Sequence, residues 1–475
     1  MNKIKKIALV SPPSSLEERY GKFAAAGSTM PSLGLLSLAA VAMRAGVDVK
    51  IIEAAAYGMS HDEVTDQLAL YQPDLVGITA TTLSIFHAHE TAEAVHQALP
   101  GVLAVIGGPH VSAVPEETLT RFPHFDIAAL GEGEATLVEL IEALSEGKKL
   151  SAVRGLALRN ENEILLTGPR EKIKDLDSLP LPAWGLLPGF PARFRPAPFR
   201  YRQLPAATLV SSRGCPNNCL FCDRTVFGRA CRMFSAEYVL EMIGRLHKDY
   251  GVRELVFEDD TFVVNKPRVL KICEGIRKSG WGLTWSCLGR VDMVSPELLK
   301  EMRRAGCWQI GYGVESGDQS ILDLVEKKIK LERVRQALAW TKETGMMTKG
   351  FFILGFPTET KETMQKTIDF AKSNALDDIS VFKLTPLPGS RIYEIAHEYG
   401  SFDNDWRKMN LLDAVFVPKD LKKEDLDDAA KRMMREFYMR PKVILSYLMR
   451  LLRNPSHVLP LLKGFLAFRR AVSNS

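Results

Sequence analysis

The sequence predicts an α/β protein with a doubly wound parallel sheet, then a six-stranded partial barrel, then a helical C-terminal tail. Two observations lead to this fold class. Short apolar runs alternate with helical patterns from about residue 4 to residue 384, as in parallel sheets covered by helices. The length of 475 residues also exceeds what one compact core supports, so at least two domains are expected.

The first predicted domain, residues 1–148, is built on five buried strands. Helical patterns separate the strands, so right-handed crossovers would arrange them in one Rossmann-like parallel sheet. The strands are expected at residues 4–10, 47–52, 75–79, 103–106 and 125–130. The helices are expected at residues 33–44, 62–70, 87–98 and 135–144.

The carboxyl ends of these five strands form the expected binding edge, because ligands of doubly wound sheets bind there. The turns at this edge are rich in Gly and Thr, which let a large cofactor approach the backbone closely. The candidate cofactor-binding residues are Ser11, Pro12, Thr79, Thr81, Thr82, Gly107, Gly108, His110, Gly131 and Glu132. A nicotinamide cofactor is disfavoured, since no Gly-x-Gly-x-x-Gly motif follows the first strand.

Residues 149–206 are predicted to form a hairpin and a linker. Apolar runs at 153–159 and 164–166 flank a polar turn, as in a β-hairpin. From residue 179 to 205 the chain is rich in proline, so an extended course is expected. Four aromatic residues of this linker are expected to pack on the second domain, namely Trp184, Phe190, Phe194 and Phe199.

The second predicted domain, residues 207–400, contains six strand–helix units. Six units predict an open version of a complete parallel barrel, with its chemistry at the carboxyl ends of the strands. The strands are expected at residues 207–211, 254–257, 283–287, 308–314, 348–354 and 379–384. The helices are expected at residues 236–248, 268–278, 296–305, 333–344 and 362–374.

Three cysteines follow the first strand of this domain with the spacing Cys-x3-Cys-x2-Cys, at Cys215, Cys219 and Cys222. Three thiolates can hold a cubane [4Fe–4S] cluster with one iron open to another ligand, whereas structural zinc normally takes four protein ligands. The alternative is a zinc site completed by Cys231 or His247, in a non-catalytic zinc or interaction module. Neither residue forms a second close ligand pair, which favours the cluster.

This cysteine motif just after a strand resembles the signature of the radical S-adenosylmethionine (SAM) superfamily. The resemblance implies a TIM-type partial barrel in which the open iron chelates the amino and carboxylate groups of SAM. It also implies that one electron from the reduced cluster cleaves SAM to a 5′-deoxyadenosyl radical, which abstracts hydrogen from an unactivated carbon. An electron donor such as flavodoxin or ferredoxin is therefore expected.

Polar residues near the ends of the second, third and fourth barrel strands are the candidates for binding SAM. An amino acid head group needs a carboxylate for its ammonium and a cation for its carboxylate. The candidates are Asp259, Asp260, Arg290 and Glu315. The resemblance agrees, because the family uses acidic residues after the second strand and Glu-Ser-Gly-like loops after the fourth. A surface salt bridge or a helix cap is the alternative for each.

The first domain resembles the cobalamin-binding domain of one large class of radical SAM enzymes, which includes anaerobic magnesium-protoporphyrin ester cyclases and hopanoid-modifying enzymes. The matching motifs of this domain are Pro31-Ser-Leu-Gly-Leu-Leu, Gly107-Gly-Pro-His110 and Gly131-Glu-Gly-Glu134, and Leu384-Thr-Pro-Leu-Pro-Gly-Ser390 resembles the barrel end of the same class. The Asp-x-His-x-x-Gly motif, whose histidine ligates cobalt in many cobalamin proteins, is absent here and in many members of the class. The alternative is a Rossmann-like domain used only for packing.

The resemblance implies methylation of an unactivated carbon with cobalamin as the leading reaction. Radical cyclisation or rearrangement without methyl transfer is the alternative, and the substrate is expected to be a small molecule or a lipid. One cluster is expected, because no cysteine precedes Cys215 or follows Cys307. The same distribution argues against a disulfide framework and predicts a cytoplasmic protein.

Residues 401–475 are predicted to be a helical extension that is basic and amphipathic at its end. Residues 437–475 hold seven Lys or Arg and no Asp or Glu, although the whole chain is only +5. The positive charge is thus concentrated here, and no nucleic acid partner is expected. Two short helices, broken near Asn454-Pro455, would suit peripheral contact with the inner face of the cell membrane. Docking on the barrel is the alternative.

Overall fold

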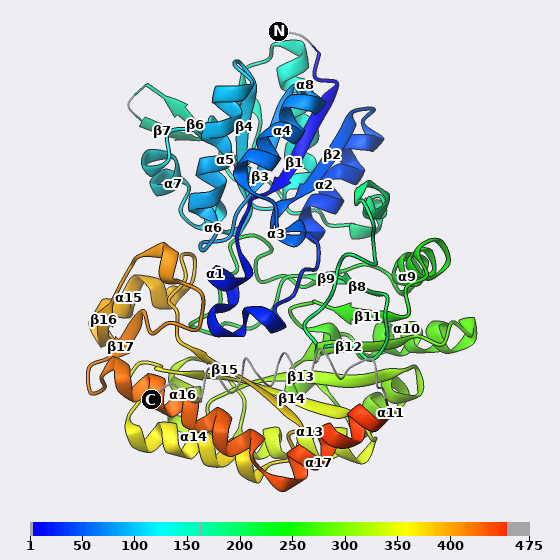
Figure 1. Cartoon of the computed structure of the whole chain (residues 1–475), viewed down its shortest axis with the longest axis vertical. Coiled ribbons are helices and arrows are strands. Elements are labelled where there is room, and N and C mark those ends of the chain that lie inside the picture. Colours follow the sequence, from blue (N-terminus) through cyan, green and yellow to red (C-terminus); the bar gives the residue numbers. More distant parts are fainter. Residues whose placement is uncertain (1–2, 162, 199, 454–475) are drawn as a thin grey trace. The chain divides into compact units, whose positions relative to one another are not determined.

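The computed structural model of the chain describes residues 3–161, 163–198 and 200–453 (Figure 1). The described residues form two compact units. The first unit draws its residues from Met1–Ser15, Thr29–Phe194 and Asp223–Arg232, and the second from Leu16–Ser28, Arg195–Cys222 and Met233–Ser475. Each unit contains one large sheet, so the predicted α/β class is confirmed.

The first unit is built on a seven-stranded sheet in the order β2-β1-β3-β4-β5-β6-β7. Its strands are β1 (Lys6–Ser11), β2 (Asp48–Glu53), β3 (Leu75–Thr79), β4 (Leu103–Gly107), β5 (Ile127–Ala129), β6 (Leu156–Asn160) and β7 (Glu163–Leu166). Strands β1 to β5 are parallel and form the predicted doubly wound core. The hairpin of β6 and β7 extends this core antiparallel to β5.

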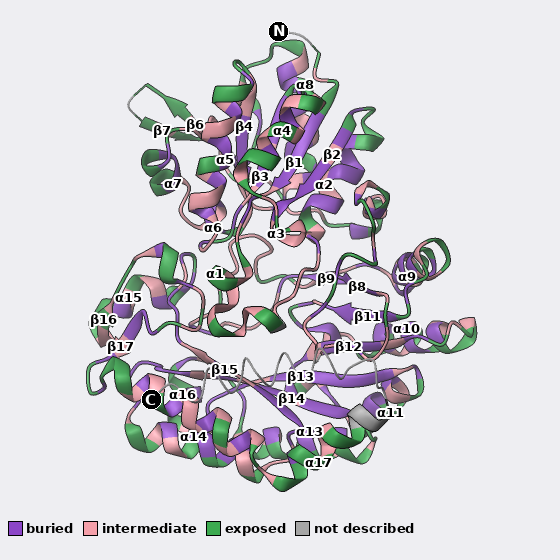
Figure 2. Ribbon diagram, viewed as in Figure 1, coloured by how far each residue is buried: buried purple, intermediate pink, exposed green. Residues whose placement is uncertain are grey.

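Helices cover both faces of the first sheet. They are α2 (Leu33–Arg44), α3 (Ala54–Tyr57), α4 (His61–Tyr71), α5 (Ile85–Ala98), α6 (Pro109–Ala113), α7 (Pro115–Arg121) and α8 (Gly133–Glu146). Helix α2 packs on α8, and α4 packs on α5. Right-handed crossovers place these two helix pairs on opposite faces of the sheet. Strand residues such as Ile7 and Val10 are fully buried, while the outer turns of the helices are exposed (Figure 2).

The second unit is built on a six-stranded parallel sheet in the order β15-β14-β13-β12-β11-β8. Its strands are β8 (Ala206–Leu209), β11 (Glu254–Phe257), β12 (Thr284–Gly289), β13 (Cys307–Glu315), β14 (Met347–Leu354) and β15 (Asp378–Lys383). Each strand pairs with the strand of the next strand–helix unit along the chain, as in a parallel barrel that has not closed. The predicted six-unit partial barrel is confirmed.

Six α-helices of the second unit lie between strands β8 and β15. They are α9 (Ala236–Tyr250), α10 (Lys266–Ser279), α11 (Pro296–Arg304), α12 (Gln319–Leu324), α13 (Leu331–Glu343) and α14 (Lys361–Ser373). The side chains of Ser235, Asn265, Ser295 and Thr360 each accept a hydrogen bond from the backbone N–H three residues later. The starts of the five predicted helices differ from the observed starts by at most two residues.

The proline-rich linker does not follow the prediction that its aromatic residues pack on the second domain. Trp184 and Phe194 are buried within the first unit, where the ring of Phe194 packs edge to face on Tyr57 at 5.3 Å. The backbone N–H of Ala183 donates to the carbonyl of Leu36 in α2, which holds this part of the linker on the first unit. Phe190 contacts Phe194 there as well, and Phe199 lies outside the described residues.

The C-terminal region adds α15 (Arg391–Tyr399), the antiparallel pair β16 (Gly400–Phe402) and β17 (Phe416–Pro418), α16 (Lys423–Tyr438) and α17 (Pro441–Arg453). Helix α16 packs on β15 and α14, and the ammonium of Lys372 lies 2.6 Å from the carboxylate of Glu436. In the described part of the chain, no helix has the length and hydropathy needed to cross a membrane. The second predicted tail helix, after Pro455, lies outside the described residues.

Candidate active site

The three cysteines of the motif lie in a loop that follows β8 and the short strand β9 (Ser212–Arg213). Cys219 is buried, Cys215 is half-buried and Cys222 is exposed. A hydrogen bond with the Cys222 thiol, followed by the nearby Lys327 cation, lowers the pKa of Cys219 to about 6 although burial opposes the shift. The same hydrogen bond, together with burial, raises the pKa of the Cys222 thiol, so Cys222 keeps its proton while Cys219 is the thiolate of the pair. Because the thiolate is the metal-binding form of cysteine, a metal at Cys222 would displace that proton.

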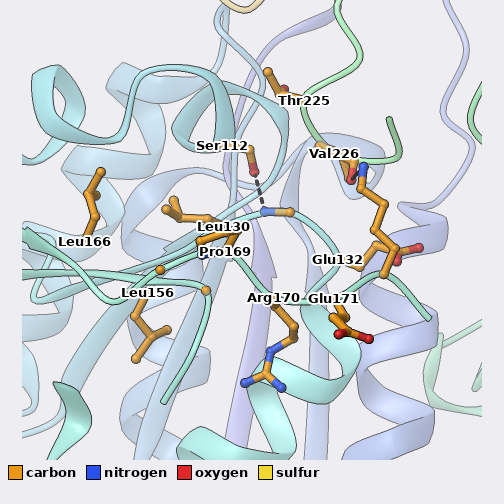
Figure 3. A pocket seen from close by; sticks show the side chains of 14 residues that line it. Ser112, Leu130, Glu132, Leu156, Leu166, Pro169, Arg170, Glu171, Thr225 and Val226 are labelled. Atoms are coloured by element: carbon orange, nitrogen blue, oxygen red, sulfur yellow. Dashed lines mark hydrogen bonds between the residues drawn. The ribbon is translucent and has the colours of Figure 1, made fainter. Parts of the chain in front are cut away.

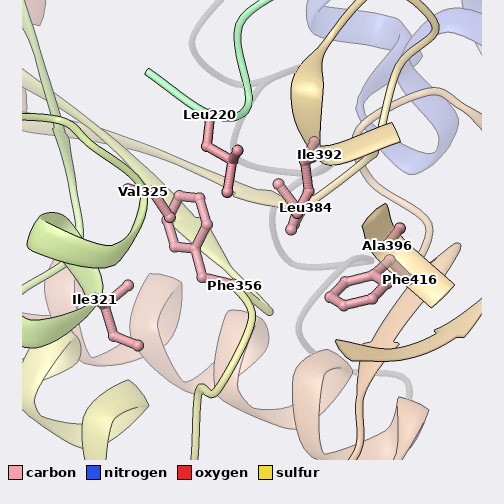
Figure 4. Close-up of a cluster of buried hydrophobic side chains, with 8 residues drawn as sticks. All are labelled: Leu220, Ile321, Val325, Phe356, Leu384, Ile392, Ala396 and Phe416. Atoms are coloured by element: carbon pink, nitrogen blue, oxygen red, sulfur yellow. The ribbon is translucent and has the colours of Figure 1, made fainter. Parts of the chain in front are cut away.

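Hydrophobic packing anchors the cysteine loop to the second unit. The side chain of Leu220 enters a buried cluster, shown in Figure 4, with Ile321, Val325, Phe356, Leu384, Ile392, Ala396 and Phe416. The Leu220 N–H donates to the Val325 carbonyl at 2.9 Å, and its own carbonyl accepts from the Ile392 N–H at 3.1 Å. The loop is therefore fixed on two sides between its second and third cysteines.

Polar side chains contact the first half of the loop. The amide of Asn217 donates to the sulfur of Cys215 at 3.2 Å, and the hydroxyl of Thr261 lies 4.0 Å from the same sulfur. The amide of Asn218 donates to the Glu326 carboxylate at 2.7 Å. These hydrogen bonds fix the side-chain orientations of both asparagines.

The two predicted SAM-binding acids after β11 occupy different environments. Asp259 is fully buried and accepts hydrogen bonds from the Ser211 N–H at 3.1 Å, the Ser211 hydroxyl at 2.8 Å and the Ser212 hydroxyl. These contacts tie the end of β8, and hence the start of the cysteine loop, to β11. Asp260 is exposed and accepts a hydrogen bond from the backbone of Gly214.

The other two predicted SAM-binding residues, Arg290 and Glu315, meet at a buried lysine. The ammonium of Lys327 lies 2.6 Å from the Glu315 carboxylate, and Arg290 donates to the Lys327 carbonyl at 3.0 Å. Arg290 also forms an ion pair with Asp292 at 3.0 Å. Although burial lowers the pKa of Lys327, the Glu315 and Cys219 anions outweigh it and raise that pKa. Lys327 therefore carries a fixed positive charge, 5.8 Å from the Phe221 ring of the cysteine loop.

In the first unit, the structure brings the predicted residues of two strand-end turns together. The N–H of Ala80 donates to the Gly107 carbonyl at 3.0 Å, and the His110 Nδ1 lies 3.1 Å from the Thr82 hydroxyl. A Cβ at Gly108, where φ is +103°, would lie 2.7 Å from the Ala80 carbonyl oxygen, so only glycine fits there. Burial lowers the pKa of His110 to about 3, which keeps its imidazole neutral.

Two further predicted residues lie near these turns, and two lie at the end of β1. Thr79 ends β3, and the Thr81 N–H donates to the Ser84 hydroxyl at 3.0 Å. Ser11 is the last residue of β1, and Pro12 after it is buried. The turns after β3 and β4 thus support each other through a backbone hydrogen bond.

A cavity of about 300 Å³ opens beside the end of β5 (Figure 3). Gly131 lies on its wall, where its N–H donates a hydrogen bond to the Ser112 hydroxyl oxygen at 2.9 Å. Gly131 has a φ of +74° and open space where a Cβ would stand. The Glu132 carboxylate, also on the wall, pairs with Arg232 at 2.8 Å and accepts from the Ile173 N–H at 3.0 Å.

Comparison with known proteins agrees with this arrangement. The family model of the Radical SAM superfamily matches residues 209–371, and that of the B12 binding domain matches residues 22–141. An uncharacterized methyltransferase of Pyrococcus horikoshii is 35% identical over 446 residues, which covers 94% of this chain and 95% of that protein. The chain belongs to the B12-binding radical SAM family. Its cofactors are a [4Fe–4S] cluster, SAM and cobalamin.

Two further matches describe the range of the family. The anaerobic magnesium-protoporphyrin IX monomethyl ester cyclase of Cereibacter sphaeroides is 30% identical over 430 residues, covering 89% of this chain and 69% of the cyclase. Among solved structures, the cobalamin-dependent SAM radical enzyme OxsB, with aqua-cobalamin and SAM bound, has a TM-score of 0.75 at 20% identity, covering 96% of this chain and 72% of OxsB. The radical SAM methyltransferase TsrM from Kitasatospora setae has a TM-score of 0.68 at 17% identity, covering 84% of this chain and 75% of TsrM. This enzyme is therefore related to both methyltransferases and cyclases.

The residues of both units fit these cofactors. Three free cysteines on one short loop are a suitable donor set for a cluster with an open iron. His247, one candidate for a fourth zinc ligand, instead places its Nδ1 3.0 Å from the Val252 carbonyl oxygen. In the first unit, the open space beside Gly131 allows a ligand to approach the backbone.

Sequence reasoning did not find Lys327 or Arg232. Lys327 stands in the run Glu326-Lys-Lys328, which resembles a solvated surface stretch. Glu326 and Lys328 both have a φ of +53°, and this turn directs the lysine between them inward. Arg232 follows the cysteine motif with no periodic pattern around it, so its pairing with Glu132 could not be read from spacing.

Proposed function

We propose that this enzyme transfers a methyl group to an unactivated carbon of a small-molecule substrate. The proposal rests on the 35% identity to the uncharacterized methyltransferase of Pyrococcus horikoshii, which covers 95% of that protein's length. When bound, the cluster and SAM supply a carbon radical, and cobalamin supplies a carrier for the methyl group. The protein's own residues bind, orient and shield these groups.

We propose the following roles at the cluster and SAM site. Cys215, Cys219 and Cys222 hold the cluster, and Asp259 positions their loop through Ser211 and Ser212. Arg290 and Lys327 provide the cationic side of the site for the SAM carboxylate. Their positions near Cys219 support this role, since both cations lower the pKa of its thiol.

We also propose roles for the remaining predicted residues. Glu315 and Asp260 offer carboxylate oxygens for the SAM ammonium and ribose hydroxyls. Cobalamin lies along the binding edge of the first sheet, at the turns after β1, β3, β4 and β5. The residues proposed to contact it are Ser11, Pro12, Thr79, Thr81, Thr82, Gly107, Gly108, His110, Gly131 and Glu132.

The corresponding functional division of the chain is a cobalamin domain over residues 1–148, a hairpin and linker over 149–206, a radical SAM barrel over 207–400 and an extension over 401–475. A proposed electron donor, such as a flavodoxin or ferredoxin, would reduce the cluster. We propose a cytoplasmic location and no nucleic acid partner.

Product analysis tests methyl transfer directly. The anaerobically reconstituted enzyme would be reduced and incubated with cobalamin, candidate substrates and SAM labelled in its methyl group. Transfer predicts a product that carries the labelled methyl group. Cyclisation is the second candidate function, favoured by the 30% identity to the cyclase, and predicts a product that has lost hydrogen and carries no label.

We further propose that the extension contacts an anionic membrane surface and that the substrate is hydrophobic. In α17, Val443 is buried, whereas the apolar side chains of Ile444, Leu445, Leu448 and Met449 are exposed. An exposed apolar helix face within a basic segment suits the interface of an anionic bilayer.

Liposome co-sedimentation at low salt tests this contact. Replacing Leu445 and Leu448 with Gln should reduce pelleting with anionic vesicles, because each removes exposed apolar area. Leu70→Gln is the matched control, since Leu70 is 85% exposed on α4 of the first unit. Equal pelleting of the wild type, the variant with Gln at both Leu445 and Leu448, and Leu70→Gln would defeat this proposal. The methyl-transfer proposal would be unaffected.

A further inference from the structure

Two histidines and a glutamate come together where α4 packs on α5 in the first unit. His61 is the first residue of α4, and His87 and Glu90 lie one turn apart near the start of α5. The side chains of His61 and His87 are 30% and 23% exposed, and that of Glu90 is 55% exposed. The cluster is thus at the surface of the unit, where an ion could enter from solvent.

The local fold fixes the positions of these side chains. The Ser60 hydroxyl accepts from the Glu63 N–H at 3.2 Å, and the Glu63 carboxylate accepts from the Ser60 N–H at 2.8 Å. This capping box sets where α4 begins and therefore where His61 stands. On α5, residues three apart share one face, so His87 and Glu90 both face the first turn of α4.

Two of the three ligand-atom distances within the cluster match those of a tetrahedral metal site. His61 Nε2 lies 3.2 Å from Glu90 Oε2, and His87 Nδ1 lies 3.4 Å from the same oxygen. Ligands about 2.0–2.1 Å from a zinc ion in tetrahedral geometry stand about 3.3 Å apart. All three ligand atoms lie within 4.8 Å of one another, so a small movement of the histidine rings completes the set.

We propose that His61, His87 and Glu90 bind a divalent transition metal ion, with zinc as the ion that best suits two imidazoles and a carboxylate. The set leaves one coordination position for water. The ion would join α4 to α5, and α5 begins directly after the strand-end turn that contains Thr81 and Thr82. It would therefore stabilise the edge at which we place cobalamin. The metal site itself does not depend on the proposed function.

A second histidine group on α5 offers a contrast. His89 Nε2 lies 3.0 Å from His124 Nδ1, and His96 Nε2 lies 3.0 Å from the Asp126 carboxylate. Within the described ranges, however, no three of these groups bring ligand atoms within 4.8 Å of one another, as those of His61, His87 and Glu90 do. His96 therefore serves as a matched control, since its side chain is 31% exposed and paired with one acid.

The test is zinc binding to the full-length enzyme after cluster reconstitution and removal of loosely bound metal. A zinc titration against a competing chromophoric chelator should detect one tight site. His61→Ala, and Glu90→Gln as a milder variant at an exposed side chain, should each weaken zinc binding by about 10-fold to 100-fold. His96→Ala should bind zinc as the wild type does.

X-ray absorption at the zinc edge distinguishes this site from the cysteine loop. We expect a shell of nitrogen and oxygen ligands near 2.0 Å and no sulfur near 2.3 Å. Zinc should also raise the thermal unfolding midpoint of the wild type and the His96 variant but not that of the His61 variant. A sulfur shell, or unchanged zinc affinity in both His61→Ala and Glu90→Gln, would overturn the proposal.

Discussion

At the scale of single residues, Lys327 determines the charge beside the cysteine loop. Its ammonium and the Glu315 carboxylate form a buried ion pair, with the side chains 9% and 8% exposed. Removing one partner of such a pair leaves an uncompensated buried charge, which is far more costly than removing both. The stability of a single variant can therefore be compared with that of the double variant to test the ion pair.

Lys327→Met should destabilise the fold by about 3–5 kcal/mol, because Glu315 then remains buried without its partner. The double variant Lys327→Met with Glu315→Gln should recover most of that loss. Urea unfolding of the apoprotein measures both. A single variant as stable as the double variant would contradict the pairing.

Glu359 gives the fold a pH dependence. It is fully buried after β14, accepts a hydrogen bond from the Phe356 N–H at 3.0 Å, and burial raises its pKa from 4.5 to about 8. Between these values the folded chain holds a proton that the unfolded chain has released. The contribution of this group to stability is therefore full below about pH 4.5 and is lost as the pH rises through 8.

Glu359→Gln removes this ionisation and should become more favourable relative to the wild type as the pH rises. From about pH 6 to about pH 8 the relative gain should be on the order of 2 kcal/mol in unfolding free energy. Urea unfolding at the two pH values measures it, with the exposed Glu343→Gln as control. A constant difference between Glu359→Gln and the wild type would show that Glu359 is already ionised.

The residues that sequence could identify are those with a fixed local spacing. The three cysteines stand within eight residues of one another, so their motif is visible without a structure. Asp259 was found as a polar residue after a strand, but its burial against Ser211 and Ser212 depends on strand pairing. Lys327 reaches Glu315 through an irregular turn, which no periodic pattern reveals.

At the scale of helices and strands, the sequence predicted most of both sheets because their signals are local. Apolar runs mark the strands, and helical periodicity marks the helices between them. The packing of Phe194 on Tyr57 was not predictable, since a linker without periodicity carries no information about the surface it follows. The same holds for the docking of α16 on β15.

The cysteine loop offers a test of how an element is held in place. Leu220→Ala should leave a cavity in the buried cluster and destabilise it by about 2–4 kcal/mol, while loosening the loop itself. Leu384→Ala removes the same number of atoms from the cluster but leaves the leucine of the loop in place. We expect a chelator to strip iron from Leu220→Ala faster than from Leu384→Ala at equal stability. Equal rates would mean that the loop does not depend on its leucine anchor.

At the scale of the whole molecule, two units supply the two cofactor sites of the family. The B12 binding domain match falls within residues 22–141, and the radical SAM match falls within residues 209–371. Removing the cysteines should therefore not remove cobalamin. Cys219→Ala should lose iron yet retain cobalamin on gel filtration as the wild type does. Loss of both cofactors together would contradict independent sites.

The most direct test of the central claim is reductive cleavage of SAM by the anaerobically reconstituted enzyme, with iron and sulfide measured on the same sample. The wild type should contain one [4Fe–4S] cluster and release 5′-deoxyadenosine after reduction. Alanine at Cys215, Cys219 or Cys222 should abolish both, whereas Cys231→Ala should change neither. A colourless wild-type protein with stoichiometric zinc at the cysteines and no cleavage of SAM would contradict the account.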